Sequence, residues 1–333
     1  MSKDFRLIGV PKLNRMLFSV IIPCFNASGT LERLFDSLNR QTFRDFEVIC
    51  IDDSSTDHTS TVVQEYKQSH DLTICLVRNA KNSGPGVSRN KGISLSKGKY
   101  LCFMDSDDFI DDHYFERVSS SIQETSADIV FFGTKQVLGH VIRPRPCAEF
   151  NSVREAMAMC GGSLWGACWR KELFNGLSLP DIRNAEDIAV IPVLISRAER
   201  IMSLPDLLYC YVHRNTSLSS TCSPNVSYSF VKSFEYTKSM IDVNKFYNEV
   251  EFHGIKTVLY GATLVAIKAG MNNREIESLW SVFLPFFRTW VKNPYLKTFP
   301  GPKKWFVKAV RRKSFSMLRL YASLHTRILS KIR

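Results

Sequence analysis

Short apolar runs alternate with amphipathic helical patterns along the first third of this 333-residue sequence, and this alternation restricts the fold more than any other feature. The apolar runs predict strands at residues 17–22, 46–51, 73–77 and 100–104. Between the first two runs, apolar residues recur at three- and four-residue spacing, at Leu31, Leu34, Phe35 and Leu38. Because strands that alternate with helices form βαβ units, we expect an α/β fold with a mostly parallel sheet flanked by helices.

The pattern changes beyond about residue 151, where helical segments are separated by Gly and Pro. A chain of this length suggests about two domains. We expect an N-terminal extension at residues 1–16, an α/β domain at 17–220, a helical region at 221–301 and a basic amphipathic tail at 302–333. A linker before the tail is predicted from Pro294, Pro300, Gly301 and Pro302.

The cysteines and the apolar runs bear on where the chain resides. Nine cysteines without a Cys-x-x-Cys pair give no readable zinc site or disulfide framework. Cys50, Cys75 and Cys102 lie within apolar runs and are expected to be buried. Residues 1–16 lack the apolar stretch of a signal peptide, and no charge-free apolar run approaches the roughly 20 residues of a membrane-spanning helix. We therefore expect a reducing, cytoplasmic location without a membrane span.

The formal charge of +12 is concentrated at the C-terminal end. After Glu277 the sequence has 13 Lys and Arg residues and no Asp or Glu, whereas the rest has 31 basic and 32 acidic residues. The excess of positive charge belongs to the tail, which argues against a basic nucleic-acid groove in the main domain.

Three carboxylates lie in the stretch Asp105-Ser106-Asp107-Asp108, directly after the apolar run at residues 100–104. Open α/β sheets bind their ligands at the carboxyl edge of the strands. Like charges this close repel one another and favour a bound cation, and hard cations such as Mg²⁺ or Mn²⁺ bridge carboxylates to substrate phosphates. The alternative is a solvated acidic turn that caps the next helix.

The other predicted strands also end in polar residues. Pro23-Cys24-Phe25-Asn26 follows the first strand, and Asp52-Asp53-Ser54-Ser55-Thr56-Asp57 follows the second. If the strands are parallel, these side chains meet at one edge, where a carboxylate can accept from a ribose or base and Phe25 can lie against a base. We expect Ser55 or Thr56 to cap the next helix and Asp52 or Asp53 to face a ligand.

Three later segments carry further candidate groups. The Gly84–Asn90 segment opens a helix, and its Arg89 suits phosphate oxygens, although the segment is not a dinucleotide fingerprint. Glu186 and Asp187 precede an apolar helix, where acidic residues either favour the helix start or supply a general base. His213 and Arg214 could reach a diphosphate or a metal, but a lone histidine is more often structural.

Together these motifs resemble the inverting glycosyltransferases of family 2, which have the GT-A fold, a Rossmann-like α/β arrangement. The resemblance covers about residues 17–220, and its motifs are Phe18–Asn26, Ile51–Asp57, Ser88–Gly92 and Gly98–Asp108, with looser matches at Trp165, Glu186-Asp187 and Tyr209–Ser219. Two departures are Ser54 or Ser55, where the family usually has Gly, and Lys99, where an acidic residue is frequent. The basic tail has no counterpart in the family pattern.

The resemblance implies transfer of a sugar, with inversion, from a nucleoside-diphosphate sugar such as a UDP-sugar to a glycan or lipid-linked glycan, as in bacterial polysaccharide or lipooligosaccharide synthesis. It implies Asp187, with Glu186 beside it, as catalytic base, and Mn²⁺ or Mg²⁺ held by Asp105 and Asp107, to which we add His213. Donor-binding residues are expected at Pro23, Phe25, Asn26, Asp52, Asp53, Arg89, Asn90, Asp105 and Ser106. Acceptor contacts are expected at Trp165 and Arg214, with Trp169 a second candidate for stacking on a sugar.

Two other functional classes stay open at this point. A phosphohydrolase or phosphotransferase of the haloacid dehalogenase kind also has Asp-x-Asp after a strand, but that motif normally lies on the first strand of its core. A nucleic-acid binder would rest on the basic tail alone, without a recognisable fold motif. We expect no nucleic-acid partner.

The basic tail suggests an amphipathic helix, because Met317, Tyr321, Leu324 and Ile328 follow helical spacing. Such a helix suits an anionic membrane surface. Alternatively, its apolar stripe packs on the catalytic domain and its charges are solvated. The expected location is therefore the cytoplasm, either free or attached peripherally to the cytoplasmic face of the inner membrane.

Overall fold

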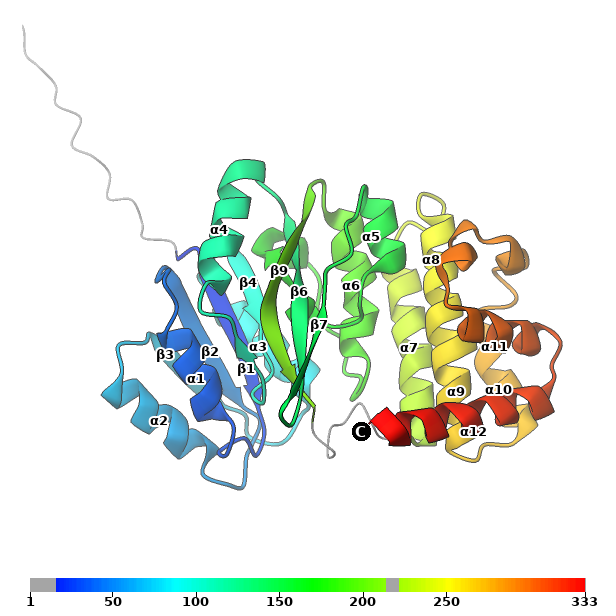
Figure 1. Ribbon diagram of the computed structural model, residues 1–333, viewed down its shortest axis with the longest axis horizontal. Helices are drawn as coiled ribbons and strands as arrows, with labels where there is room; N and C mark the ends of the chain where they lie inside the picture. Colours follow the sequence, from blue (N-terminus) through cyan, green and yellow to red (C-terminus); the bar gives the residue numbers. More distant parts are fainter. Residues whose placement is uncertain (1–15, 214–221, 333) are drawn as a thin grey trace, which may run out of the picture.

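A computed structural model describes residues 16–213 and 222–332 of the chain. Most of the expected N-terminal extension at residues 1–16, and the candidate acceptor residue Arg214, lie outside this description. In the last helix, side chains are described as far as residue 327, so Ile328 of the predicted stripe lies outside the described side chains. A single mixed sheet forms the left part of the molecule in Figure 1, and a bundle of helices forms the right part.

Four parallel strands form the first half of the sheet, in the order β3-β2-β1-β4. Their bounds are Phe18–Cys24 for β1, Phe46–Asp52 for β2, Ile74–Arg78 for β3 and Tyr100–Phe103 for β4. Three helices connect them, namely α1 (Leu31–Asn39), α2 (Thr59–Ser69) and α3 (Pro85–Leu95). The predicted alternation is therefore confirmed.

Two details of this half differ from the predictions. Pro23, expected to stop the first strand, lies inside β1, where a missing N–H can be tolerated at the end of a strand. Cys75 is exposed rather than buried, because β3 is the edge strand of the sheet and one of its faces is open.

The second half of the sheet mixes directions. β8 (Ala167–Arg170) lies antiparallel between β4 and β6 (Ile129–Leu138), and β6 pairs in parallel with β9 (Ile201–Val212). The short β5 (Phe109–Ile110) and β7 (Val141–Arg145) pair antiparallel with β9 and β6. β6 extends well beyond its buried first half, because its far end pairs with both β7 and β9.

Side chains of β1 alternate between the two faces of the sheet, and each face has its own apolar cluster. Val20 and Ile22 pack with α1 and with α4 (Tyr114–Thr125). Ile21 points to the other face, where it meets α3 so closely that a Cβ on Gly92 would lie 2.4 Å from its Cγ2 atom. The glycine thus lets α3 lie directly on β1, and this fixes the position of Arg89, one turn earlier in the same helix.

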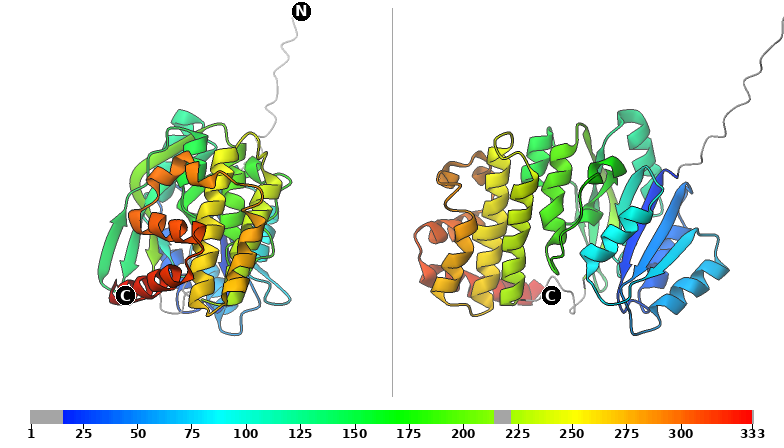
Figure 2. Two further views of the ribbon diagram at one scale, coloured as in Figure 1. Left: turned by 90° about the vertical axis from the view of Figure 1, so that its right-hand side faces the viewer. Right: turned by 180° about the vertical axis from the view of Figure 1, so that it is seen from behind.

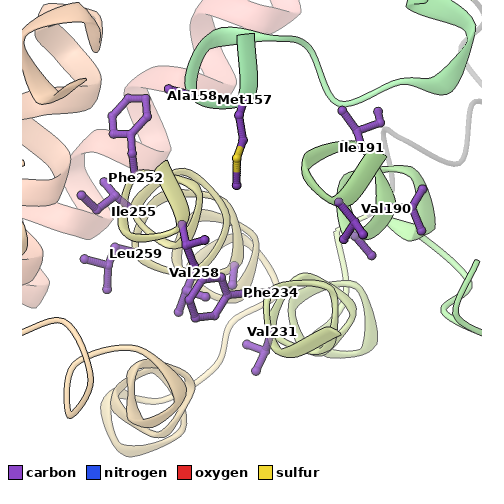
Figure 3. Close-up of a cluster of buried hydrophobic side chains, with 14 of the residues drawn as sticks. Met157, Ala158, Val190, Ile191, Val231, Phe234, Phe252, Ile255, Val258 and Leu259 are labelled. Atoms are coloured by element: carbon purple, nitrogen blue, oxygen red, sulfur yellow. The ribbon is translucent and has the colours of Figure 1, made fainter. Parts of the chain in front are cut away.

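The helical part packs against the sheet through α5 (Val153–Met159) and α6 (Glu186–Arg197). It contains α7 (Pro224–Met240), then a continuous run of α8 (Tyr247–Gly254), a π-helical segment (Ile255–Ala262) and α9 (Thr263–Lys268), followed by α10 (Asn273–Leu279). Figure 3 shows side chains of α5, α6, α7 and the α8–α9 run meeting in one apolar cluster. The helical region therefore shares its core with the second half of the sheet.

The C-terminal segment is part of this core and not a free tail. The expected linker is wrong, since Pro294 begins a short 3₁₀ helix and Gly301 begins α11 (Gly301–Arg311). The last helix, α12 (Phe315–Ile332), buries Leu318 and Ala322 against the bundle. The predicted stripe is thus only partly right: Met317 and Tyr321 are half-buried, whereas Leu324 is 48% exposed.

None of the helices in the described ranges is both long and apolar enough to cross a membrane.

Candidate active site

The acidic segment predicted from the sequence forms a loop at the carboxyl end of β4. Met104 continues the strand direction by donating its backbone N–H to the Ile21 carbonyl, and the chain then turns through Asp105, Ser106 and Asp107. Asp105 and Asp107 are half-buried, and Asp108 is buried. One carboxylate oxygen from each of the three aspartates can be chosen so that all lie within 4.8 Å of one another. The group therefore offers oxygen ligands to a divalent cation.

Asp108 holds this loop in place. Its carboxylate accepts from the Tyr209 hydroxyl at 2.7 Å and from the Val212 backbone N–H at 2.7 Å. The Tyr209 hydroxyl in turn accepts from the Asp105 backbone N–H at 3.1 Å. Burial, and then the charge of Asp105, raise the pKa of Asp108 to about 8. Asp108 therefore ties the loop to β9, which leaves Asp105 and Asp107 as the accessible carboxylates.

Arg89, from the second turn of α3, joins this loop to the start of α6. Its guanidinium donates to Asp105 at 2.9 Å, to Glu186 at 2.6 Å and to Asp187 at 3.1 Å. The side chain is only 6% exposed. Burial alone would lower the pKa of Arg89, but the three carboxylates raise it, so the group stays charged. The guanidinium faces carboxylates, and its predicted contact with phosphate oxygens stays a prediction.

Burial raises the pKa of two of the three carboxylates around Arg89. Burial raises the pKa of Asp105 to about 6, against the lowering effect of Arg89. Burial and then the charge of Asp187 raise the pKa of Glu186 to about 7. The buried Nε atom of Arg89 has no hydrogen-bond partner among the described residues. Three carboxylates share the single positive charge of Arg89, so negative charge is in excess when all three are ionised, and this favours occupation by a cation.

Asp187 is the more accessible member of the Glu186-Asp187 pair, with a side chain that is 15% exposed against 8% for Glu186. Its carboxylate also accepts from the Leu164 backbone N–H at 3.0 Å, which fixes its orientation. Both residues begin α6, as the alternative interpretation of the sequence expected. Just before them, Ala185 has φ of +89°, a left-handed conformation that is strained for a side-chain-bearing residue.

The edge formed by β1 and β2 has the residues predicted to bind the donor. Phe25 is 48% exposed directly after β1, so its ring is available to lie against a base. Asp53 is buried and accepts from the Asn79 amide and from the backbone N–H groups of Ser83 and Gly84. Asn26 accepts from the Thr56 N–H.

Asp52 is fully buried and accepts from the Ser55 backbone N–H and the Ser60 hydroxyl. Although burial raises its pKa, these bonds lower it below the usual value. The expectation that Ser55 or Thr56 caps the next helix is wrong. α2 begins at Thr59 after His58, and the Ser55 hydroxyl instead accepts from the Asn26 N–H.

Two predicted residues have other contacts than expected. Asn90 uses both ends of its amide on the backbone of Leu179, at 2.8 Å each, and so ties α3 to the loop before α6. His213 is exposed at the end of β9 with its ring edge-on to Tyr211, and it is not in the carboxylate group that could hold a metal. Neither geometry supports the predicted roles in binding the donor or the metal.

Trp165 lies near Asp187, because it directly follows Leu164, whose backbone N–H donates to the Asp187 carboxylate. Its ring stacks on Tyr209, with centroids 4.7 Å apart, and on Tyr211 at 5.5 Å. It also lines a pocket of about 220 Å³ between β6, α5 and α6. Trp169, the second candidate for stacking on a sugar, is buried, as expected for at least one of the two. Tyr209 begins one of the loosely matching segments of the sequence, but its hydrogen bond to Asp108 was not predictable from any local pattern.

Comparison with known proteins finds the family to which the sequence motifs pointed, over the N-terminal part of the chain. Residues 19–163 match the family described as Glycosyl transferase family 2. The chain is similar to the poly(ribitol-phosphate) beta-glucosyltransferase of Bacillus spizizenii, with 29% identity over 59% of this chain and 32% of that protein. It is also similar to the uncharacterized glycosyltransferase EpsJ of Bacillus subtilis, with 31% identity over 61% of this chain and 63% of that protein. The chain thus spans less than two thirds of the length of these relatives.

A solved structure is similar to this one over almost the whole chain. The crystal structure of S. aureus TarS 1–349 in complex with UDP-GlcNAc has a TM-score of 0.70 at 23% identity, and covers 94% of this chain and 92% of that one. At this identity the likeness establishes the fold. Residues 19–163 are therefore similar to glycosyl transferase family 2, and they lie within a GT-A-like α/β fold.

Proposed function

We propose that the protein transfers a sugar from a nucleoside-diphosphate sugar to a hydroxyl of a glycan or glycolipid, with inversion at the anomeric carbon. One observation carries this proposal: Arg89 bonds Asp105 and Asp187 with a single guanidinium, so the candidate metal ligand and the candidate base lie on opposite sides of one small group. The family match and the UDP-GlcNAc bound to the TarS structure support a nucleotide-sugar donor.

The acidic loop fits a divalent cation such as Mn²⁺ or Mg²⁺. Asp105 and Asp107 would hold it, because their oxygens lie within 4.8 Å of each other and both side chains are accessible. When bound, such an ion supplies positive charge for the leaving diphosphate. Asp108 would keep the loop in position through Tyr209.

Asp187 is proposed as the general base that takes the proton from the acceptor hydroxyl. Its two oxygens are oriented by Arg89 and the Leu164 N–H, so the carboxylate is held in one place. A base that removes this proton lets the oxygen attack the anomeric carbon opposite the leaving diphosphate, and the configuration inverts. Glu186 is more buried, and we assign it a supporting role beside Arg89.

The donor base is proposed to lie against Phe25 at the edge of β1 and β2, with Pro23, Asn26 and Ser106 alongside it. Asp52 and Asp53 would contribute chiefly by holding the loops of this edge, since their oxygens bond backbone groups. The acceptor is proposed to enter beside Trp165, which borders the pocket between β6, α5 and α6.

Binding of nucleotide sugars tests this proposal. In a thermal-shift screen with Mn²⁺, one UDP- or GDP-sugar should raise the melting temperature, because a ligand that binds only the folded state stabilises it. Release of phosphate from an aryl phosphate, without any effect of nucleotide sugars, would instead favour the phosphohydrolase alternative.

The variant Asp107→Ala should lose the metal-dependent part of donor binding, since it removes one of two accessible oxygen ligands. Calorimetric titration with the nucleotide sugar, with and without Mn²⁺, measures this directly. The matched control is Asp71→Ala, an exposed aspartate just before β3 at the opposite edge of the sheet. Equal metal dependence in both variants would remove Asp107 from the site.

A further inference from the structure

The two C-terminal helices leave a face of cations and large apolar side chains in solvent. On α11, Trp305 is 38% exposed and Lys308 and Arg311 are exposed, as is Arg312 directly after the helix. On α12, Leu320 is 56% and Leu324 is 48% exposed. We call these six residues the basic helical face.

The six residues belong to one surface because the two helices touch. The Trp305 ring stacks on Tyr321 of α12, with centroids 6.1 Å apart and an angle of 28° between the planes. Tyr321 is next to Leu320, and Leu324 lies one helical turn further along the same side. Lys308 and Arg312 are likewise one turn apart, on the side of α11 that carries Trp305.

Core packing does not explain this face. α12 is already held in the bundle by the buried Leu318 and Ala322, and α11 by Phe306 and Val310. Exposed tryptophan and leucine beside cations are what an anionic lipid surface binds, because apolar groups enter the acyl boundary while Lys and Arg meet the headgroups. A soluble anionic polymer would require only the cations.

Of the two helices that carry this face, α12 lies on the functional side of the molecule, whereas α11 lies above it in Figure 1. α12 runs along the lower edge of the molecule in Figure 1, and its C-terminal end approaches the side on which β9 ends. Both views in Figure 2 place α12 at this same edge. β1 and β4 run parallel, so their carboxyl ends, with Phe25 and Asp105, lie at this edge too.

We propose that the basic helical face docks the protein on an anionic lipid bilayer and so brings the active site to an acceptor carried by a lipid. This inference rests on the proposed function for the nature of the acceptor, but the docking itself is independent of sugar transfer. Attachment of this kind would be peripheral.

Vesicle binding tests the proposal with the full chain. The protein should co-sediment with vesicles of equal parts phosphatidylcholine and phosphatidylglycerol, and not with phosphatidylcholine alone. The charge variant Lys308→Gln/Arg311→Gln/Arg312→Gln should weaken binding by about 100-fold, as expected for three cations near an anionic surface. The apolar variant Leu320→Gln/Leu324→Gln should weaken it by at least about tenfold.

The matched control is Arg44→Gln/Lys97→Gln/Arg200→Gln, which removes three exposed cations that precede β2, β4 and β9 at the far edge of the sheet. It should bind vesicles like the wild type. Equal losses in the charge variant and this control would overturn the proposal. So would binding that survives the apolar variant and is matched by retention on soluble polyphosphate, because that result identifies an anionic polymer as the partner.

Thermal stabilisation by the nucleotide sugar separates this test from that of the proposed function. All three variants should keep it, since none of the substituted residues lies at the active site. Loss of vesicle binding with intact donor binding supports docking through this face, whereas vesicle binding without any response to nucleotide sugars would contradict the proposed function alone.

Discussion

Arg89 shares one positive charge among carboxylates from two distant parts of the chain, Asp105 on the loop after β4 and the Glu186-Asp187 pair at the start of α6. A planar guanidinium can donate to several carboxylates at fixed angles, which the ammonium of lysine cannot reproduce. The spacing between the candidate metal ligands and the candidate base is therefore set by one side chain, and α3 sets where that side chain lies.

A second residue-level feature is Ser54, which has φ of +63°, in the left-handed region. The resemblance to family 2 noted that glycine is usual at this position or the next. The left-handed conformation destabilises a residue with a side chain by roughly 1–2 kcal/mol, and glycine avoids this strain. Part of the resulting stabilisation is lost, because glycine has greater conformational entropy in the unfolded chain. Ser54→Gly should therefore raise the free energy of unfolding by about 0.5–1 kcal/mol.

Urea denaturation measures this change, with Ser54→Ala as the control that keeps the unfavourable conformation. Ser54→Ala should be no more stable than the wild type. A destabilised Ser54→Gly variant would mean that the serine side chain makes a stabilising contribution greater than the backbone strain.

At the scale of elements, the close contact between α3 and β1 connects packing to the site. A Cβ on Gly92 would meet the Ile21 Cγ2 atom at 2.4 Å, too close for any real contact. Gly92→Ala should therefore push α3 off the sheet, destabilise the protein by about 1–3 kcal/mol and weaken transfer by displacing Arg89. Denaturation and activity measured on the same preparation test both parts.

A double-mutant cycle with Ile21→Ala provides the check, because that substitution removes the atom in conflict. The two changes together should cost less than the sum of their separate effects. Additive effects would show that the glycine is required for another reason.

The elements of the first half of the sheet were predictable because local apolar periodicity determines them, as at Leu31, Leu34 and Leu38. That the candidate site residues lie close together was predictable for a related reason, since polar groups after parallel strands meet at one edge. The hydrogen-bond partners of these residues were not predictable. Arg89 and Glu186 are 97 positions apart, and no local pattern shows that they bond. The length of β6 was likewise hidden, because its second half is defined by pairing with β9.

At the scale of the whole molecule, the apolar cluster of α5 and α6 continues through α7 to α12, so the C-terminal helices stabilise the part that holds Asp187. Deleting residues 301–333 would expose Tyr260, whose ring contacts Phe306 and Tyr321, and remove Phe306, Val310 and Leu318 from the core. Burial of each large apolar side chain contributes about 1.5–3 kcal/mol. The shortened chain should therefore melt at least about 5 °C lower or aggregate.

Scanning calorimetry on the full and shortened chains measures this difference. An unchanged melting temperature would mean that residues 301–333 form an independent tail, so that their apolar stripe does not stabilise the rest of the protein. The same argument is why point variants, and not truncation, are the proper test of membrane docking.

Asp187, held by Arg89 and the Leu164 N–H, is proposed to accept the proton of the attacking hydroxyl. Single-turnover transfer and donor affinity should be measured for the wild type, for Asp187→Asn and for Asp181→Asn, an exposed aspartate in the preceding loop. Asp187→Asn keeps the size of the side chain but not its basicity, so donor binding should stay nearly intact while transfer falls at least about 100-fold. Asp181→Asn should behave like the wild type, and an Asp187→Asn variant that transfers sugar at the wild-type rate would contradict the account.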